Sequence, residues 1–117
     1  QSITIILCAH SKLNVIGERQ LFGLRVLERG FNVIHADADA LLLREPFNLF
    51  AGGDVVGSRI WGKPRSVVQR WGAGLCTGFY FLRSTPEVIQ LSRRIHAELQ
   101  AKAEQWPDDW QTSDQMY

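Results

Sequence analysis

Residues 31–43 read FNVIHADADALLL, an apolar run that contains two aspartates, Asp37 and Asp39. Its first part, residues 31–36, has the β-branched and apolar composition of a buried strand. Burying a carboxylate without a partner costs much free energy, so two acids in such a run require compensating groups. The stretch therefore predicts a buried strand that ends at a pair of carboxylates.

Strand and helix patterns alternate on both sides of this stretch. Further strands are predicted at residues 3–8, 54–58 and 77–83, helices at 19–29 and 84–104, a helical turn at 46–50, and a loop at 59–74. Gly30 fits the position just beyond a helix, where a left-handed residue ends it. Such alternation predicts an α/β fold with a mainly parallel sheet flanked by helices, in which ligands bind beyond the carboxyl ends of strands.

Composition narrows the class of protein. Hydrophobic residues make up 45% of the 117 residues, which is enough for a core, and the net charge of +1 comes from interspersed acids and bases. That pattern argues against a nucleic-acid partner, and no apolar run is long enough to span a bilayer. We expect residues 1–117 to be a single, partial domain, because the sequence lacks an initial Met and ends in what resembles the start of another element. Any membrane anchor would then lie outside it.

The two cysteines, Cys8 and Cys76, are far apart and form no C-x-x-C pair. This spacing argues against a structural zinc site. Two buried thiols are the commoner arrangement, and a disulfide in an oxidising compartment is the alternative.

The aspartate pair predicts a metal site. Side chains two positions apart in an extended chain share a face, so we expect Asp37 and Asp39 to point the same way. Their mutual repulsion is relieved by a cation, and oxygen ligands favour Mg²⁺ or Mn²⁺, with water and diphosphate oxygens completing the shell. Such an ion stabilises a departing nucleoside diphosphate. The D-x-D pattern alone leaves an alternative open, in which one aspartate caps a turn and the other pairs with Arg44.

The segments around and including the pair come in a defined order. They are Gly30-Phe31-Asn32-Val33, Asp37-Ala38-Asp39, Arg44-Glu45-Pro46, Asp54-Val55-Val56, the run TGFYFLRSTP at residues 77–86, and Asp114-Gln115. In this order the chain, from about Arg19 onward, resembles the nucleotide-diphospho-sugar transferase family that includes plant arabinosyltransferase-like enzymes.

The resemblance implies a GT-A fold, which is Rossmann-like, and a divalent cation, usually Mn²⁺ and otherwise Mg²⁺. It implies transfer of a sugar from a nucleotide-sugar donor, with a UDP-sugar expected, to a hydroxyl of a glycan or protein acceptor, with retained anomeric configuration. For a eukaryotic chain it implies the Golgi or another secretory-pathway lumen.

The resemblance also assigns roles to residues. Asp39 would bind the metal directly, and Asp37 would share the metal or contact the ribose of the donor. Thr77 and Gly78 would lie where the backbone approaches the donor sugar, because glycine permits close approach.

At the end of the chain, Asp114 and Gln115 would face the sugar and the acceptor as the catalytic pair. The sequence departs from the family at Cys76, where Asn is usual, and at Ala40, where a β-branched residue is common.

Two other functions fit parts of the sequence. A haloacid-dehalogenase-like phosphatase also places D-x-D after a strand, and Ser58, Lys63 and Asp108-Asp109 follow in the order such an enzyme needs. That family requires Thr or Val where Leu41 stands, and it leaves the TGF segment unexplained. A non-catalytic module that binds a nucleotide sugar or a glycan is the third alternative.

Several polar and aromatic residues have two interpretations. His35 alternates with Asp37 and either joins the site or is a hydrogen-bonded core histidine, which is the commoner case. Trp61 or Trp71 either lines an acceptor groove or packs in a loop, the commoner use. The basic residues of the predicted loop either close over a diphosphate or are solvated; they are Arg59, Lys63, Arg65 and Arg70.

Overall fold

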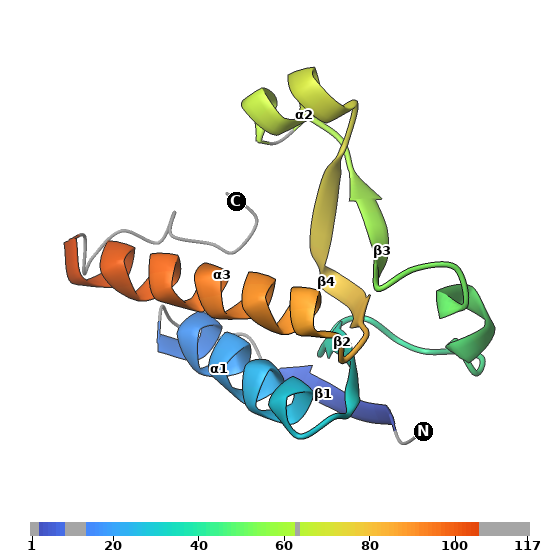
Figure 1. The fold of residues 1–117 in the computed structure, drawn as a ribbon. Coiled ribbons are helices and arrows are strands. Elements are labelled where there is room, and N and C mark those ends of the chain that lie inside the picture. Colours follow the sequence, from blue (N-terminus) through green and yellow to red (C-terminus); the bar gives the residue numbers. More distant parts are fainter. Residues whose placement is uncertain (1–2, 9–13, 63, 106–117) are drawn as a thin grey trace.

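The computed structural model describes residues 3–8, 14–62 and 64–105. The elements follow in the order β1 (Ile3–Cys8), α1 (Asn14–Glu28), β2 (Asn32–Asp37), η1 (Phe47–Phe50), β3 (Val55–Ile60), α2 (Arg65–Trp71), β4 (Gly74–Leu82) and α3 (Pro86–Gln105), as Figure 1 shows. No helix in the described part of the chain is both long enough and apolar enough to cross a membrane.

The four strands form one mixed sheet in the order β1-β2-β4-β3. β1 pairs with β2 in parallel, whereas β4 is antiparallel to both of its neighbours. The α/β class is thus as predicted, but the expectation of mainly parallel pairing was wrong for these strands. The reason is α2, which lies at the tip of the β3–β4 pair instead of crossing back over the sheet, as a helix in a parallel connection must.

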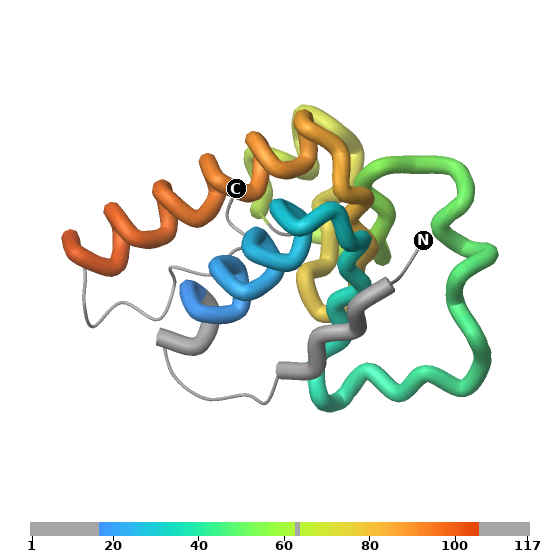
Figure 2. Tube along the Cα trace, turned by 60° about the horizontal axis from the view of Figure 1, so that its bottom comes forward, coloured from blue at the N-terminus to red at the C-terminus, as the bar shows by residue number. Residues whose placement is uncertain are grey.

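The core has two parts, one on each face of β2. Val33 and Ile34 are neighbours in the strand, so their side chains point to opposite faces. On Val33's face, α1 and α3 lie side by side (Figure 1, Figure 2), and the buried cluster consists of Val26, Leu27, Val33 and Val88. On the other face, the cluster consists of Ile34, Phe50 and Phe81. Figure 2 shows the chain between β2 and β3, which carries Phe50, leaving the body in a wide loop and returning to it.

The predicted end of the first helix is confirmed. Gly30 has φ +85°, and its N–H donates to the carbonyl of Leu27 at 2.9 Å. Glycine adopts this conformation without the steric cost that other residues pay. The helix begins earlier than predicted, at Asn14.

The start of α3 follows the predicted pattern of a hydroxyl cap followed by proline. Thr85 Oγ1 accepts from the N–H of Val88 at 3.3 Å, and Pro86 is the first helical residue. Ser84 has another role, because its Oγ donates to the Leu27 carbonyl at 2.7 Å and its N–H donates to Asn32 Oδ1 at 2.9 Å. These bonds fix the β4–α3 junction against the α1–β2 junction.

The predicted loop between β3 and β4 was wrong, because it contains α2 and the ends of both strands. Pro64 precedes the helix, and Gly72 ends it with φ +81°. Proline before a helix and glycine after it are boundary signals that the sequence did carry. The helix has only 7 residues, which is too short to reveal a helical period.

Candidate functional site

The aspartate pair lies at the carboxyl end of β2, where the chain turns. Asp37 is the last residue of the strand, and the N–H of Ala40 donates to its carbonyl at 2.9 Å. Asp39 is exposed in this turn. The strand geometry from which a shared face was predicted therefore stops at Asp37 and does not extend to Asp39.

One oxygen of Asp37 is held from inside the protein. Arg19 Nη1 donates to Oδ1 at 3.2 Å, and His35 Nε2 lies 2.8 Å from the same oxygen. A carboxylate only accepts, so Nε2 carries the proton that it donates. The side chains are 9%, 1% and 19% exposed for Arg19, His35 and Asp37, respectively. The arginine partner of the pair is thus Arg19; Arg44 makes no ion pair with any residue in the described ranges.

His35 combines both interpretations of its position. It is fully buried in β2, and its ring stacks on Tyr80 of β4, with centroids 4.9 Å apart. The two residues are partners in the β2–β4 register. His35 is therefore a core histidine whose Nε2 reaches the site and helps to fix the orientation of Asp37.

The other oxygen of Asp37 faces Gly78. The β2–β4 register pairs Ala36 with Phe79, which brings the next residues of the two strands together. A Cβ built on Gly78 would lie 3.2 Å from Asp37 Oδ2 and 3.7 Å from Cys76 Sγ. Because glycine has no side chain, Oδ2 borders open backbone and not a methyl group. The fold thus brings the D-x-D and T-G segments together.

Thr77 and Gly78 lie in an irregular part of β4. Gly57 pairs with Tyr80, but Arg59 pairs with Leu75, so residues 76–79 of β4 lie opposite Ser58 alone. A bulge of this kind takes extra residues out of the ladder and bends the strand.

A cavity of about 120 Å³ adjoins the site on the side of α3. Thr77, Tyr80 and Gln20 line it near the site, and Pro64, Val67 and Leu91 line it farther away. The wall is mostly apolar with a few polar groups, which is the usual character of a ligand pocket.

Not every predicted residue falls on the described structure. Asp114 and Gln115 lie outside it, as do Lys63 and Asp108-Asp109 of the phosphatase alternative. Ser58 lies in β3, which β4 separates from β2. Cys76 has a free, half-buried thiol, so the suggested disulfide is not formed.

The side chains of the site can be compared with the ligands that a divalent cation needs. Within residues 3–8, 14–62 and 64–105, no three His, Cys, Asp or Glu side chains come together as a metal-binding group. The hydrogen bonds with Arg19 and His35 involve Oδ1 of Asp37. The carboxylate oxygens outside these two bonds are Oδ2 of Asp37 and the oxygens of Asp39. Ions such as Mg²⁺ are usually held by one or two carboxylates together with substrate phosphates. At this edge of the sheet the described chain offers the carboxylates of Asp37 and Asp39, a set that would need substrate phosphates to complete the shell of a cation.

Sequence reasoning missed Arg19 as a site residue. It was assigned only to the start of a helix, although a buried carboxylate requires a cationic partner. A helix that precedes a strand and runs back along it brings its first turns to the strand's carboxyl end. The basic residue in those turns was the signal.

A family model described as nucleotide-diphospho-sugar transferase matches residues 9–117. No curated protein and no solved structure matches the chain. The family match spans the D-x-D, T-G and D-Q segments and covers most of the sequence, in agreement with the resemblance seen there. The chain therefore belongs to the nucleotide-diphospho-sugar transferase family.

Proposed function

We propose that this chain is the catalytic part of a glycosyltransferase that moves a sugar from a nucleotide-diphosphate donor to a hydroxyl of a glycan or protein. Membership of the family supports the class of reaction. The observation that carries the proposal is the position of Asp37 Oδ2, which lies 3.2 Å from where a Cβ of Gly78 would stand and so brings two family segments together at the carboxyl end of a strand. Ligands of α/β sheets bind at such an edge.

Asp37 is suited to bind one group of the donor. Arg19 and His35 hold Oδ1, so the carboxylate has a fixed orientation before the ligand arrives. In the proposal, Oδ2 accepts a hydrogen bond from a ribose hydroxyl or shares the cation. Gly78 lets the donor approach the backbone closely.

Asp39, together with Oδ2 of Asp37, would hold Mn²⁺ or Mg²⁺ against the donor diphosphate. When bound, the cation stabilises the charge that develops on the leaving nucleoside diphosphate. Arg19 offsets part of the charge of the two neighbouring aspartates, which lets them share one small region.

At the reacting carbon, the oxygen of the acceptor hydroxyl forms a bond to the anomeric carbon as the bond to the diphosphate breaks on the same face, and the hydroxyl proton passes to an oxygen of the departing diphosphate. Asp114 stabilises the positive charge of the sugar in this proposal, Gln115 contacts the sugar or the acceptor, and the product retains the anomeric configuration. Thr77, which borders the adjoining cavity, lies beside the donor sugar.

The test is sugar transfer from a UDP-sugar in the presence of Mn²⁺. We expect Asp39→Asn to lower turnover by about a hundredfold or more, as loss of a transition-state charge contact does. Asp54→Asn is the matched control, because Asp54 lies in a surface ion pair with Arg83 and 59% of its side chain is exposed.

Other outcomes identify the alternatives. Equal turnover by the Asp39 variant and the wild type would remove the metal assignment. Donor binding without transfer or donor hydrolysis would indicate a binding module. Hydrolysis of a generic aryl phosphate, lost in Asp37→Asn, would indicate the phosphatase.

A further inference from the structure

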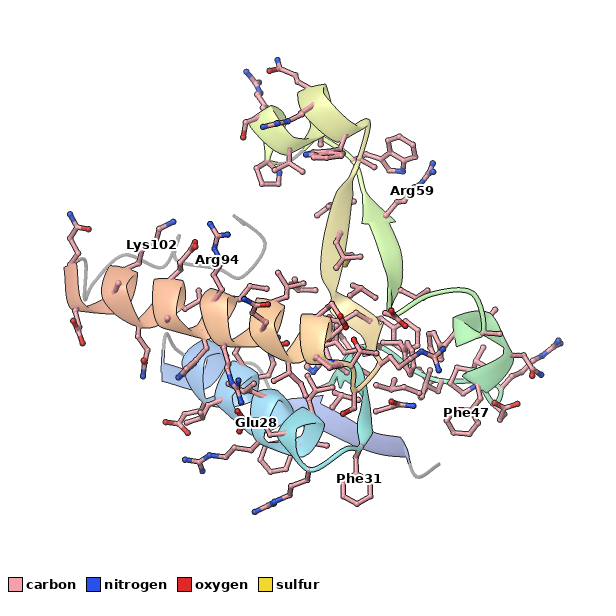
Figure 3. All side chains as sticks on the ribbon, in the orientation of Figure 1. Glu28, Phe31, Phe47, Arg59, Arg94 and Lys102 are labelled. Carbon is pink, nitrogen blue, oxygen red and sulfur yellow. The ribbon has the colours of Figure 1, made fainter. Side chains whose placement is uncertain are left out.

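Residues 59–75 form a protruding unit, here called the arm, that comprises α2 and the strand ends on either side of it. Figure 1 shows the arm extending away from α1 and α3, and Figure 3 shows Arg59 projecting outward near the end of β3. No residue of α2 is buried. Trp61 and Trp71 are 69% and 73% exposed. Tryptophan is usually well covered in a folded domain, so the arm presents aromatic surface that the core does not use.

The arm is also uniformly basic. It contains four Lys or Arg residues and no Asp or Glu. Arg59, Arg65 and Arg70 are exposed and form no ion pair with the described residues. Two arginines of α3 differ, since Arg93 pairs with Glu28 and Arg94 with Glu98. A surface of one charge sign selects a partner of the opposite sign.

Each of the two indoles of the arm has a guanidinium over it. Arg59 Cζ lies 5.7 Å from the ring centroid of Trp61, and Arg70 Cζ lies 5.6 Å from that of Trp71. Such cation–π pairs hold the arginines beside the rings. A pyranose packs its C–H face on an indole, and a guanidinium binds a carboxylate through two hydrogen bonds. A sugar that carries a carboxylate uses both groups together.

The arm is connected to the site through β4. Leu75, the last arm residue, precedes Gly78 by three positions, a separation of at most about 10 Å along a strand. The cavity beside the site is lined by Thr77 and also by Pro64 and Val67 of the arm. A chain of sugars on the arm therefore lies within reach of the reacting centre.

We propose that the arm binds an acidic saccharide, a glycan chain whose sugars carry carboxylates, and that this chain is the acceptor of the transfer. The acceptor role rests on the function proposed above. Carboxylates pair with Arg59 and Arg70, sugar rings stack on Trp61 and Trp71, and the terminal hydroxyl extends along β4 toward Asp37.

The test uses the 117-residue chain with two probes, tetragalacturonic acid and its methyl ester, in which the same rings lack charge. We expect the acid to bind, with its affinity decreasing as salt rises, and the ester to bind at least about tenfold more weakly. Arg59→Gln/Arg70→Gln and Trp61→Ala/Trp71→Ala should each weaken acid binding by about tenfold or more, as loss of Trp and Arg anchors does.

The matched control is Arg25→Gln/Arg29→Gln, which removes the same charge from exposed positions at the end of α1. It should leave the affinity unchanged. Equal binding of acid and ester, wild-type affinity in the arm variants, or an equal loss in the control would overturn the proposal. The proposal would also be overturned if the chain did not bind the acid and instead bound phosphatidylserine vesicles or a single-stranded oligonucleotide through the arm.

A parallel titration with UDP and Mn²⁺ separates this proposal from the function on which the acceptor role rests. The arm variants should retain UDP binding, because Asp37 and Asp39 are unchanged. If the wild-type chain binds the acid but not UDP, the donor assignment fails and the arm surface stands. If it binds UDP but not the acid, the arm assignment fails alone.

Discussion

Oδ2 of Asp37 faces the backbone of Gly78 so closely that a Cβ at Gly78 would stand 3.2 Å from it. The carboxylate cannot easily move away, because Arg19 and His35 hold its other oxygen. The two segments that carry the family resemblance therefore meet at one point, and small changes there should affect both ligand binding and stability.

Gly78→Ala tests this contact. The added methyl group displaces Oδ2 and narrows the space for a donor, so we expect affinity for UDP with Mn²⁺ to decrease by about tenfold and stability to decrease by about 1–3 kcal/mol. Calorimetry and urea unfolding measure the two effects. Gly52→Ala is the control, since a Cβ there meets no atom within 4 Å. An alanine variant with unchanged donor affinity would contradict the role of the contact.

Arg19→Met tests the internal partner of Asp37. The change leaves a largely buried carboxylate with one fewer charged donor, so we expect a loss of about 1–3 kcal/mol in the free energy of unfolding. The comparison is Arg94→Gln, which removes a surface pair whose side chains are 79% and 43% exposed and should cost at most about 0.5 kcal/mol. If both variants unfold at the same urea concentration, Arg19 does not hold Asp37 in solution.

His35→Phe separates the two contacts of the imidazole. Phenylalanine preserves stacking on Tyr80 but removes the hydrogen bond to Asp37 Oδ1. We expect a stability loss of about 1 kcal/mol and a weaker donor complex, because Asp37 gains rotational freedom. A Phe variant that binds UDP as tightly as the wild type would show that Arg19 alone fixes the carboxylate.

Local patterns predicted the elements that local chemistry determines. The apolar run before Asp37 became β2, Gly30 ended α1 at positive φ, and Thr85 with Pro86 began α3. Each feature depends on residues next to one another in the chain. The position of Asp37 at the end of a strand could be predicted for the same reason.

Contacts between distant residues could not be predicted in this way. The direction of β4 depends on where its connections run, and an alternating pattern is the same in either direction. The pairing of Arg19 with Asp37 depends on how α1 lies across the sheet. The close approach at Gly78 depends on the β2–β4 register, so the sequence suggested both partners but not their contact.

The two aspartates of the pair should respond differently to amidation. Asp37 accepts from Arg19 and His35, so Asp37→Asn removes the charge of the acceptor and weakens both bonds, which should cost about 1–3 kcal/mol of stability as well as donor affinity. Asp39 is exposed in the turn and has no such contacts in the described structure, so Asp39→Asn should unfold at the wild-type urea concentration. Its effect should appear only in the titration with UDP, as loss of the increase in affinity that Mn²⁺ gives over EDTA. A metal-free Asp39 variant that is as destabilised as the Asp37 variant would show that Asp39 supports the fold instead of the ligand.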